Sequence, residues 1–380
     1  MLESDEMINS IPLFKVHMPK KVDKPLLEVL HSGYIGQGSK VDEFEDRISK
    51  FIKNSNVVTV NAGTSALQLA LRLANVGYGD EVITTPMTCT ATNEPILATG
   101  AKIVWADVFP ENGLIDPSSV EKKITKKTKA VVCVDWGGTV CDLDRLLKIT
   151  RKNRIKLIED AAHAFGSTYK SKPVGSIADF TCFSFQAIKH ITTVDGGAVS
   201  TLNKSDYKRG KLLRWFGIDR EAKVIGDSRI DVDIPEWGYK FHMNDVSAVI
   251  GITQMEFINE ILSKHRENAK YYLGNIDSKY YGHPLTPWSQ KSSFWLYTMV
   301  LPSQVERIEF AEFMKKNGVA TSRVHGRNDL YKAFPKSKEK LKGVTYFYDR
   351  EECIPVHWAL TKREREKIVR LCNDFAKNHK

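Results

Sequence analysis

The sequence predicts an α/β protein with a mixed, mostly parallel seven-stranded sheet and a smaller α+β region at the C-terminal end. Seven short apolar or β-branched runs predict the strands, at 56–60, 81–84, 102–105, 130–134, 155–159, 180–184 and 197–201. Helical patterns lie between several of these runs, and strands that alternate with helices usually form parallel sheets with both faces covered. The pattern changes after about residue 243, which indicates a second region.

The helices of the first region are predicted from three stretches. One apolar stripe has helical spacing and consists of Val41, Phe44, Ile48, Phe51 and Ile52. The stretch 65–74 is rich in Ala and Leu, which favour helix. Asp142 can cap a helix that runs to residue 153.

The end of the sheet and the C-terminal region are predicted less directly. The runs 180–184 and 197–201 are too close for a helical crossover, so the far edge of the sheet should be hairpin-like. Residues 243–275 have the pattern of one long helix. Further elements are expected as a strand near 296–301 and helices near 304–317 and 361–376. We therefore expect a large domain over 1–255, with an N-terminal arm, and a small domain over 256–380.

The composition is that of an ordinary globular enzyme. The 380 residues are enough for two domains and a sizeable core, and the chain is 42% hydrophobic and 27% charged. No apolar run approaches the roughly 20 residues that cross a bilayer. The segment Met1-Leu2-Glu3-Ser4-Asp5-Glu6 is acidic and lacks the apolar stretch of a secretion signal. We expect a cytoplasmic protein that does not contact a membrane.

Cysteine spacing and charge narrow the functional classes further. None of the six cysteines forms a CxxC pair, which predicts reduced thiols and no zinc or other metal site. The net charge is +10, but the lysines are scattered, so we expect no nucleic-acid binding. The excess positive charge fits either a solvated surface or attraction of an anionic substrate such as a phosphate ester.

The segment 61–67 has the pattern of an anion-binding turn. Its residues Gly63, Thr64 and Ser65 follow a strand and open a helix, where small side chains and free N–H groups can accept an anion. A glycine turn with Thr64 or Ser65 as a helix cap is the alternative. The segment lacks the GK[ST] ending of a nucleotide-binding P-loop.

An acid and a lysine follow two later strands. Asp160 closes the run 155–159, and Lys189 lies between the run 180–184 and the Gly196-Gly197 pair. A lysine amine can condense with an aldehyde, and a carboxylate can hold a pyridine nitrogen protonated. Together these two groups indicate an enzyme that uses pyridoxal phosphate (PLP). Taken separately, Asp160 could cap a helix and Lys189 could lie in an exposed loop.

The chain resembles the sugar aminotransferases of the DegT/DnrJ/EryC1/StrS family, which are PLP enzymes of fold type I. The resembling stretches cover nearly the whole chain, at 33–38 with 44–45, 61–67, 159–166, 183–197, 238–245 and 324–325. The stretch 213–220 and the pair Asn328-Asp329 are similar to enzymes of the viosamine and perosamine type, which are 4-aminotransferases.

The resemblance implies a role for each matching residue. Lys189 would bind the cofactor covalently and move the substrate proton, and Asp160 would pair with the pyridine nitrogen. Ala162 would pack on the ring and His163 would reach the ring hydroxyl. Gly63, Thr64, Ser65 and Ser184 would hold the phosphate. The segment 240–244, with Lys240 and His242, would cross to the cofactor of a second subunit, which implies a homodimer with two shared active sites.

One departure from the family pattern concerns the cofactor ring. Thr88-Cys89 stands where the family has an aromatic residue that stacks on the ring. Cys89 cannot stack, so another residue must cover that face or leave it thinly packed.

The substrates follow only from the resemblance. It implies transfer of an amino group from glutamate, through the pyridoxamine form of the cofactor, to a nucleotide-linked 4-keto-6-deoxyhexose, for amino sugars of bacterial surface glycans such as lipopolysaccharide O-antigen. Tyr34, Arg214, His325 and Arg327 are the candidate substrate contacts. The alternatives are a different ketone (a C-3 keto-sugar, a keto-octulosonate or a small phosphorylated ketone), a sugar 3-dehydratase in which His190 replaces the lysine, and a regulatory protein without turnover.

Overall fold

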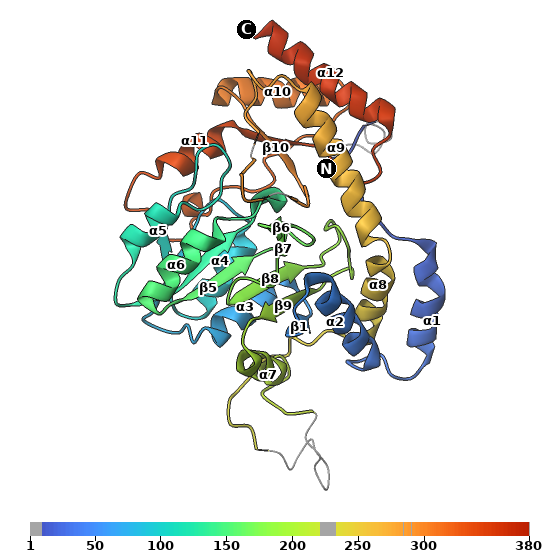
Figure 1. Cartoon of the computed structure of the whole chain (residues 1–380), viewed down its shortest axis with the longest axis vertical. Helices are drawn as coiled ribbons and strands as arrows, with labels where there is room; N and C mark the ends of the chain where they lie inside the picture. The colour runs from blue at the N-terminus through green and yellow to red at the C-terminus, as the bar shows by residue number, and fades with distance from the viewer. Residues whose placement is uncertain (1–9, 221–232, 284, 290, 380) are drawn as a thin grey trace.

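The computed structural model describes residues 10–220, 233–283, 285–289 and 291–379. The acidic segment Met1–Glu6 lies outside these residues. Seven strands form the central sheet in the order β1-β9-β8-β5-β4-β2-β3 (Figure 1). Their bounds are β1 Val57–Val60, β2 Glu81–Thr84, β3 Lys102–Trp105, β4 Thr128–Val134, β5 Lys156–Asp160, β8 Phe180–Ser184 and β9 Gly197–Thr201. Two two-residue strands, β6 (Thr168–Tyr169) and β7 (Lys172–Pro173), pair separately.

The strand directions confirm a mixed, mostly parallel sheet. Strands β3, β2, β4, β5 and β8 run parallel, whereas β9 runs antiparallel to both β8 and β1. The expected hairpin-like pair exists, but it is not the edge, because β1 lies outside it. All five residues of β9 are buried. A fully buried strand needs partners on both sides for its backbone groups, and β1 supplies the second partner.

Helices cover the sheet on both sides (Figure 1). The predicted helices are present within one or two residues, and Asp142 caps α6 by accepting a hydrogen bond from Arg145 N. Helix α3 packs across β8, β9 and β5, and α2 packs against β1 and α8. The bounds in the first part of the chain are η1 Lys20–Val22, α1 Asp23–His31, α2 Ser39–Ile52, α3 Gly63–Leu73, α4 Thr90–Ala98, α5 Pro117–Lys123, η2 Trp136–Gly138, α6 Leu143–Asn153 and α7 Lys204–Leu213.

The prediction of one helix over 243–275 is wrong. Two helices occupy this stretch, α8 (Asp245–Met255) and α9 (Ile258–Asn275). The last turn of α8 closes with short i→i−3 bonds from Glu256 N and Phe257 N, which end the α-helical ladder. Buried Gln254, in the same turn, donates its side-chain amide to the carbonyl of His17 and so ties the end of α8 to the N-terminal arm.

The C-terminal part forms a second hydrophobic core around the antiparallel pair of β10 (Tyr297–Val300) and β11 (Glu351–Ile354). Tyr272, Phe310 and Phe375 belong to this core, together with Ile11 from the N-terminal arm. The remaining elements are α10 Gln304–Lys316, η3 Asn328–Leu330, α11 Lys342–Arg350 and α12 Lys362–Asn378. A boundary at residue 255 stays a proposal. Among the described residues, no helix has the length and apolar character to cross a membrane.

Candidate active site

A cavity of about 500 Å³ lies where the carboxyl ends of β5 and β8 meet residues of the C-terminal part. Ligands of open α/β sheets gather at this edge. Asp160 and Lys189 both line the cavity, although 28 residues separate them in the sequence. The remaining wall residues that the sequence predicted are Gly63, Thr64, Cys89, Ala162, His163, Ser184 and His325.

Asp160 is fixed at the end of β5 by two hydrogen bonds. Its Oδ2 accepts from Thr92 Oγ1 at 2.7 Å, and its Oδ1 accepts from Ala162 N at 3.1 Å. Burial raises the pKa of the Asp160 carboxyl, while these two donors and the charge of Lys189 act in the opposite direction. The carboxyl group is therefore held rigidly at the cavity, where a cationic ring N–H would stabilise its charged form.

Lys189 lies in the loop between β8 and β9, which is closed by hydrogen bonds from Phe185 N to Gly196 O and from Thr193 N to Phe185 O. Its Nζ is 3.6 Å from the centre of the Trp295 ring. Burial lowers the pKa of the Lys189 amine to about 7, against the opposing charges of Asp160 and Cys89. A large fraction of the amine is then neutral and nucleophilic near neutral pH.

The predicted anion-binding turn is built by close backbone packing. Helix α3 begins after Ala62, and no side chain of the described residues caps it, so Thr64 and Ser65 are not caps. A Cβ on Gly63 would lie 2.9 Å from Ser184 Cβ, and one on Gly197 would lie 2.6 Å from Ala62 O. Gly63 and Thr64, the first residues of α3, line the cavity, and the first N–H groups of a helix have no partner within the helix. Ser65 lies in this turn, outside the described cavity lining.

Three rings form one stack in the cavity wall. The ring of His163 lies 3.9 Å from the Trp295 ring and 5.5 Å from the His325 ring, nearly parallel to both. His163 Nδ1 accepts from Gly137 N at 3.4 Å, and burial holds the pKa of His163 well below its usual range. The neutral ring therefore carries its proton on Nε2. His325 Nε2 is buried and has no hydrogen-bond partner among the described residues.

Cys89 stands at the N-terminus of α4 and lines the cavity, as does Ala162. Cys89 has no ring that could stack on a cofactor, and the large aromatic side chains in this cavity wall are Phe14, Phe183 and Trp295. Phe14 stacks on Trp295 with ring centres 5.0 Å apart.

Tyr34, Lys240 and His242 also lie outside the cavity lining of this single chain. Tyr34 is 84% exposed in the loop after α1. Lys240 is exposed, and the ring of His242 contacts the ring of Trp215, with centres 3.7 Å apart and planes tilted by 56°. Their segment runs beside the anion-binding turn, where Asn61 N donates to Phe241 O at 2.7 Å.

Arg214 is buried in an ion pair outside the cavity of Lys189, so a role as a substrate contact stays a prediction. The residue is 1% exposed, and its Nη1 donates to Glu45 Oε1 and, at 3.0 Å, to Thr59 O. Glu45 Oε1 also accepts from Thr59 N and from Thr59 Oγ1, both at 2.8 Å. The guanidinium thus joins the end of α7 to α2 and β1, away from the cavity of Lys189.

We expect Arg214→Ala to destabilise the fold by roughly 3–5 kcal/mol, because Glu45 would keep a buried charge without its partner. Urea unfolding measures this loss. In the double variant Arg214→Ala/Glu45→Ala the stranded charge is gone, so it should unfold at a higher urea concentration than the single variant. If Arg214→Ala kept its stability but bound substrate more weakly, the result would support the prediction that Arg214 contacts the substrate.

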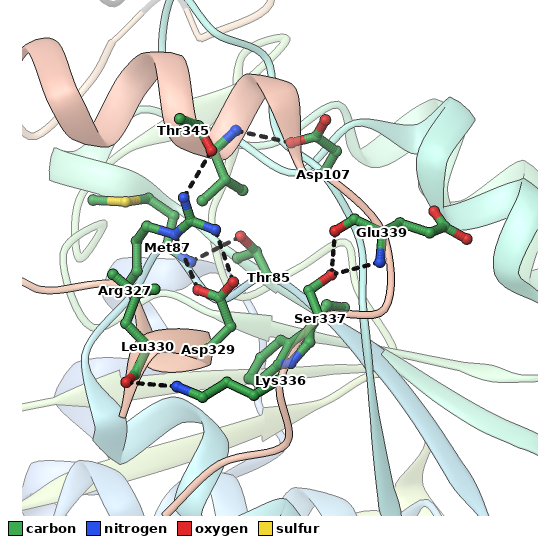
Figure 2. Close-up of polar contacts among 12 residues, drawn as sticks. Thr85, Met87, Asp107, Arg327, Asp329, Leu330, Lys336, Ser337, Glu339 and Thr345 are labelled. Atoms are coloured by element: carbon green, nitrogen blue, oxygen red, sulfur yellow. Dashed lines mark hydrogen bonds and ion pairs between the residues drawn. The ribbon is translucent and has the colours of Figure 1, made fainter. Parts of the chain in front are cut away.

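Arg327 also lies outside the cavity of Lys189. Figure 2 shows its guanidinium paired with both oxygens of Asp329, at 3.0 and 2.7 Å, and donating to Thr345 Oγ1 at 2.8 Å. It borders a separate cavity of about 700 Å³ beside Lys336 and Ser337. Its neighbour Asn328 turns inward and donates to Thr88 O at 2.8 Å.

His190 is buried away from the cavity lining. Its Nε2 lies 3.0 Å from Ser293 O, and its ring contacts the ring of His265. This position does not favour a dehydratase in which His190 replaces Lys189.

Two residues that contact Asp160 or Lys189 were not predicted. Thr92 binds Asp160, and Trp295 lies beneath Lys189. Thr92 follows Cys89 by three residues at a helix start, which is a weak signal. Nothing near Trp295 in the sequence indicates a site.

Comparisons with known proteins agree with this geometry. The family model described as the DegT/DnrJ/EryC1/StrS aminotransferase family matches residues 17–372. The chain is 33% identical to the UDP-4-amino-4,6-dideoxy-N-acetyl-beta-L-altrosamine transaminase of Campylobacter jejuni, over 90% of this chain and 91% of that protein. It is 31% identical to the GDP-perosamine synthase of Escherichia coli O157:H7, over 82% and 83%.

Solved structures agree as well. The sugar aminotransferase Spr1654 of Streptococcus pneumoniae, described as putative, has been solved in a PLP form and a PMP form. Both superpose with a TM-score of 0.89 at 29% identity, over 97% of this chain and at least 98% of that one. The chain therefore belongs to the DegT/DnrJ/EryC1/StrS aminotransferase family and is a PLP-dependent aminotransferase of fold type I.

Proposed function

We propose that this enzyme moves an amino group from glutamate to a nucleotide-linked 4-keto-6-deoxyhexose, in the synthesis of amino sugars for a surface glycan such as O-antigen. The observation that carries the aminotransfer is the placement of Lys189 and Asp160 in one cavity. The name of the Campylobacter relative, a 4-amino-4,6-dideoxy sugar transaminase, supports a nucleotide sugar and the C-4 position.

The residues of the candidate site have separate tasks in this proposal. Bound PLP supplies an electron sink for the carbanion-like step. The Lys189 amine would hold the cofactor covalently and, when free, would act as the base that moves the substrate proton. Asp160 holds a proton at the pyridine nitrogen. His163 Nε2–H donates to the ring hydroxyl, and Gly63, Thr64, Ser65 and Ser184 bind the phosphate.

The proposal includes a homodimer in which Lys240 and His242 act at the partner's cofactor, and Tyr34 contacts the substrate. The position of Lys240 and His242 outside the chain's own cavity lining, in the segment beside the anion-binding turn, supports this arrangement. We also propose that the enzyme is cytoplasmic, because its six cysteines are free, as is usual in a reducing compartment.

The two half-reactions can be tested separately. Glutamate alone should convert the bound cofactor to its amine form, which absorbs at shorter wavelength, and release 2-oxoglutarate. The aminated enzyme is then offered UDP-, GDP- and dTDP-linked 4-keto-6-deoxyhexoses, one at a time. A matched C-3 keto-sugar, a keto-octulosonate and a small phosphorylated ketone serve as competing acceptors.

We expect the spectrum to return to its starting form with one nucleotide-linked 4-keto sugar. Return with only a C-3 keto-sugar or a ketone without a nucleotide would contradict the proposed acceptor. Failure of glutamate, with success of another amino donor, would contradict the proposed donor alone. If the protein bound no PLP at all, this would favour the alternative of a regulatory protein without turnover.

A further inference from the structure

Two fully buried acids lie directly behind Asp160. Glu159 precedes it on β5, so its side chain points to the opposite face of the sheet. Asp135 follows the neighbouring strand β4, and its backbone N–H donates to the Asp160 carbonyl at 3.1 Å. Both side chains are 0% exposed. Neither lines the cavity of Lys189, so the reaction described above leaves them without a role.

Each acid has one oxygen with a donor and one without. Asp135 Oδ1 accepts from Cys141 N at 2.9 Å, and Glu159 Oε2 accepts from Thr181 Oγ1 at 2.7 Å. In the described part of the chain no donor reaches Asp135 Oδ2 or Glu159 Oε1. The side chains of Asp135 and Glu159 lie within interaction range of each other. Two carboxylates can only accept, so a hydrogen bond between them requires a proton on one of them.

We propose that Asp135 and Glu159 share one buried proton and together place a single negative charge behind Asp160. The other titratable groups that face the pair are Cys133 of β4, Cys141 of the following loop and Asp160 of β5. All of these are acids, so none of them offers a compensating positive charge. Burial and this crowding raise the pKa values of both carboxyl groups, so the pair keeps a proton at a pH where free carboxyl groups are ionised.

The charge of the pair acts on the cofactor through space. In a buried site a neighbouring negative charge favours the protonated form of a basic group. The pair therefore strengthens the hold of Asp160 on the proton at the pyridine nitrogen. Asp135 and Glu159 do not touch the reacting atoms, and we assign them as positioning residues. The inference rests on the PLP chemistry of this site and is independent of the sugar proposed as acceptor.

The shared proton is tested on the protein without cofactor. The folded chain keeps a proton that the unfolded chain releases between the ordinary carboxyl pKa of about 4 and about 7. Because the folded state binds more protons in this range, its stability falls as pH rises. Asp135→Asn and Asp135→Asn/Glu159→Gln remove the proton and keep the shapes. We expect the melting temperature of both variants to fall less steeply from pH 5 to 7 than that of the wild type.

The charge is tested on the enzyme with bound PLP. Asp135→Asn leaves the Glu159 carboxylate, which accepts from the new amide, so the net charge stays the same. The double variant has no charge. The pH midpoint of the visible absorbance of the bound cofactor should therefore be unchanged in the single variant and move down by about one unit in the double variant. Glu159→Gln is a second single variant if Asp135→Asn does not fold.

Two outcomes would overturn the proposal. The first is an equal pH dependence of melting in the wild type and all variants, which would mean that no proton is shared. The second is an equal shift of the absorbance midpoint in the single and double variants, which would indicate a structural effect of the substitutions. Neither measurement uses an amino acceptor, so failure here leaves the proposed nucleotide sugar untouched.

Discussion

Replacing Lys189 with alanine should lower the turnover number by about a thousandfold or more, because one amine both attaches the cofactor and moves the proton. Borohydride reduction followed by mass spectrometry should label Lys189 of the wild type with the cofactor and leave the variant unlabelled. His190→Gln is the matched control and should be labelled normally, since His190 bonds to Ser293 O outside the cavity. Normal turnover by Lys189→Ala would contradict the assignment.

The free enzyme should also show the titration of this amine. The neutral amine is the nucleophile, and burial lowers the pKa of Lys189 to about 7. The rate constant for PLP capture should therefore rise by about tenfold between pH 6 and 8 and level off above that. Because burial disfavours the ammonium form, Lys189→Ala should melt at no lower temperature than the wild type without cofactor. Loss of activity would then not reflect unfolding.

Asp160→Asn should lower the turnover number by about a hundredfold to a thousandfold, because a neutral amide cannot hold the ring nitrogen protonated. Thr92→Val should cost about tenfold, the value of one hydrogen bond to a charged group, since it removes the 2.7 Å donor to Asp160 Oδ2. Thr92→Ser keeps that hydroxyl and serves as the control. Steady-state kinetics with a fixed donor and acceptor measures all three variants. An Asp160→Asn enzyme with normal turnover would remove Asp160 from the mechanism.

The parts of the fold and site that follow from local patterns could be predicted from the sequence. The strand runs place Asp160 and Ser184 at the ends of β5 and β8, and Lys189 lies five residues beyond β8. These positions depend on hydrophobic patterns only a few residues long. The sheet order places Asp160 and Ser184 together because their two strands are parallel neighbours.

The parts that could not be predicted depend on contacts between distant parts of the chain. Arg214 appeared to be available because its partner, Glu45, lies 169 residues away. The helical pattern runs through residues 255–257 without Gly or Pro, while buried Gln254 at that point binds the backbone of His17, 237 residues away. Trp295 reaches Lys189 only through the packing of the C-terminal part. No spacing rule within the sequence reports such pairs.

Besides Leu13 and Phe14 of the N-terminal arm, the cavity wall is built from two separate parts of the chain, and this bears on how new specificities arise. The side that would grip the cofactor comes from residues 62–195, whereas Trp295, Ser322, Val324 and His325 enter from the C-terminal part. A chimera that exchanges only 322–325 with a homologous enzyme should change which acceptor is preferred while PLP capture persists. Such enzymes can then acquire new acceptors by substitutions in the C-terminal part of the wall, while the residues that hold the cofactor stay the same.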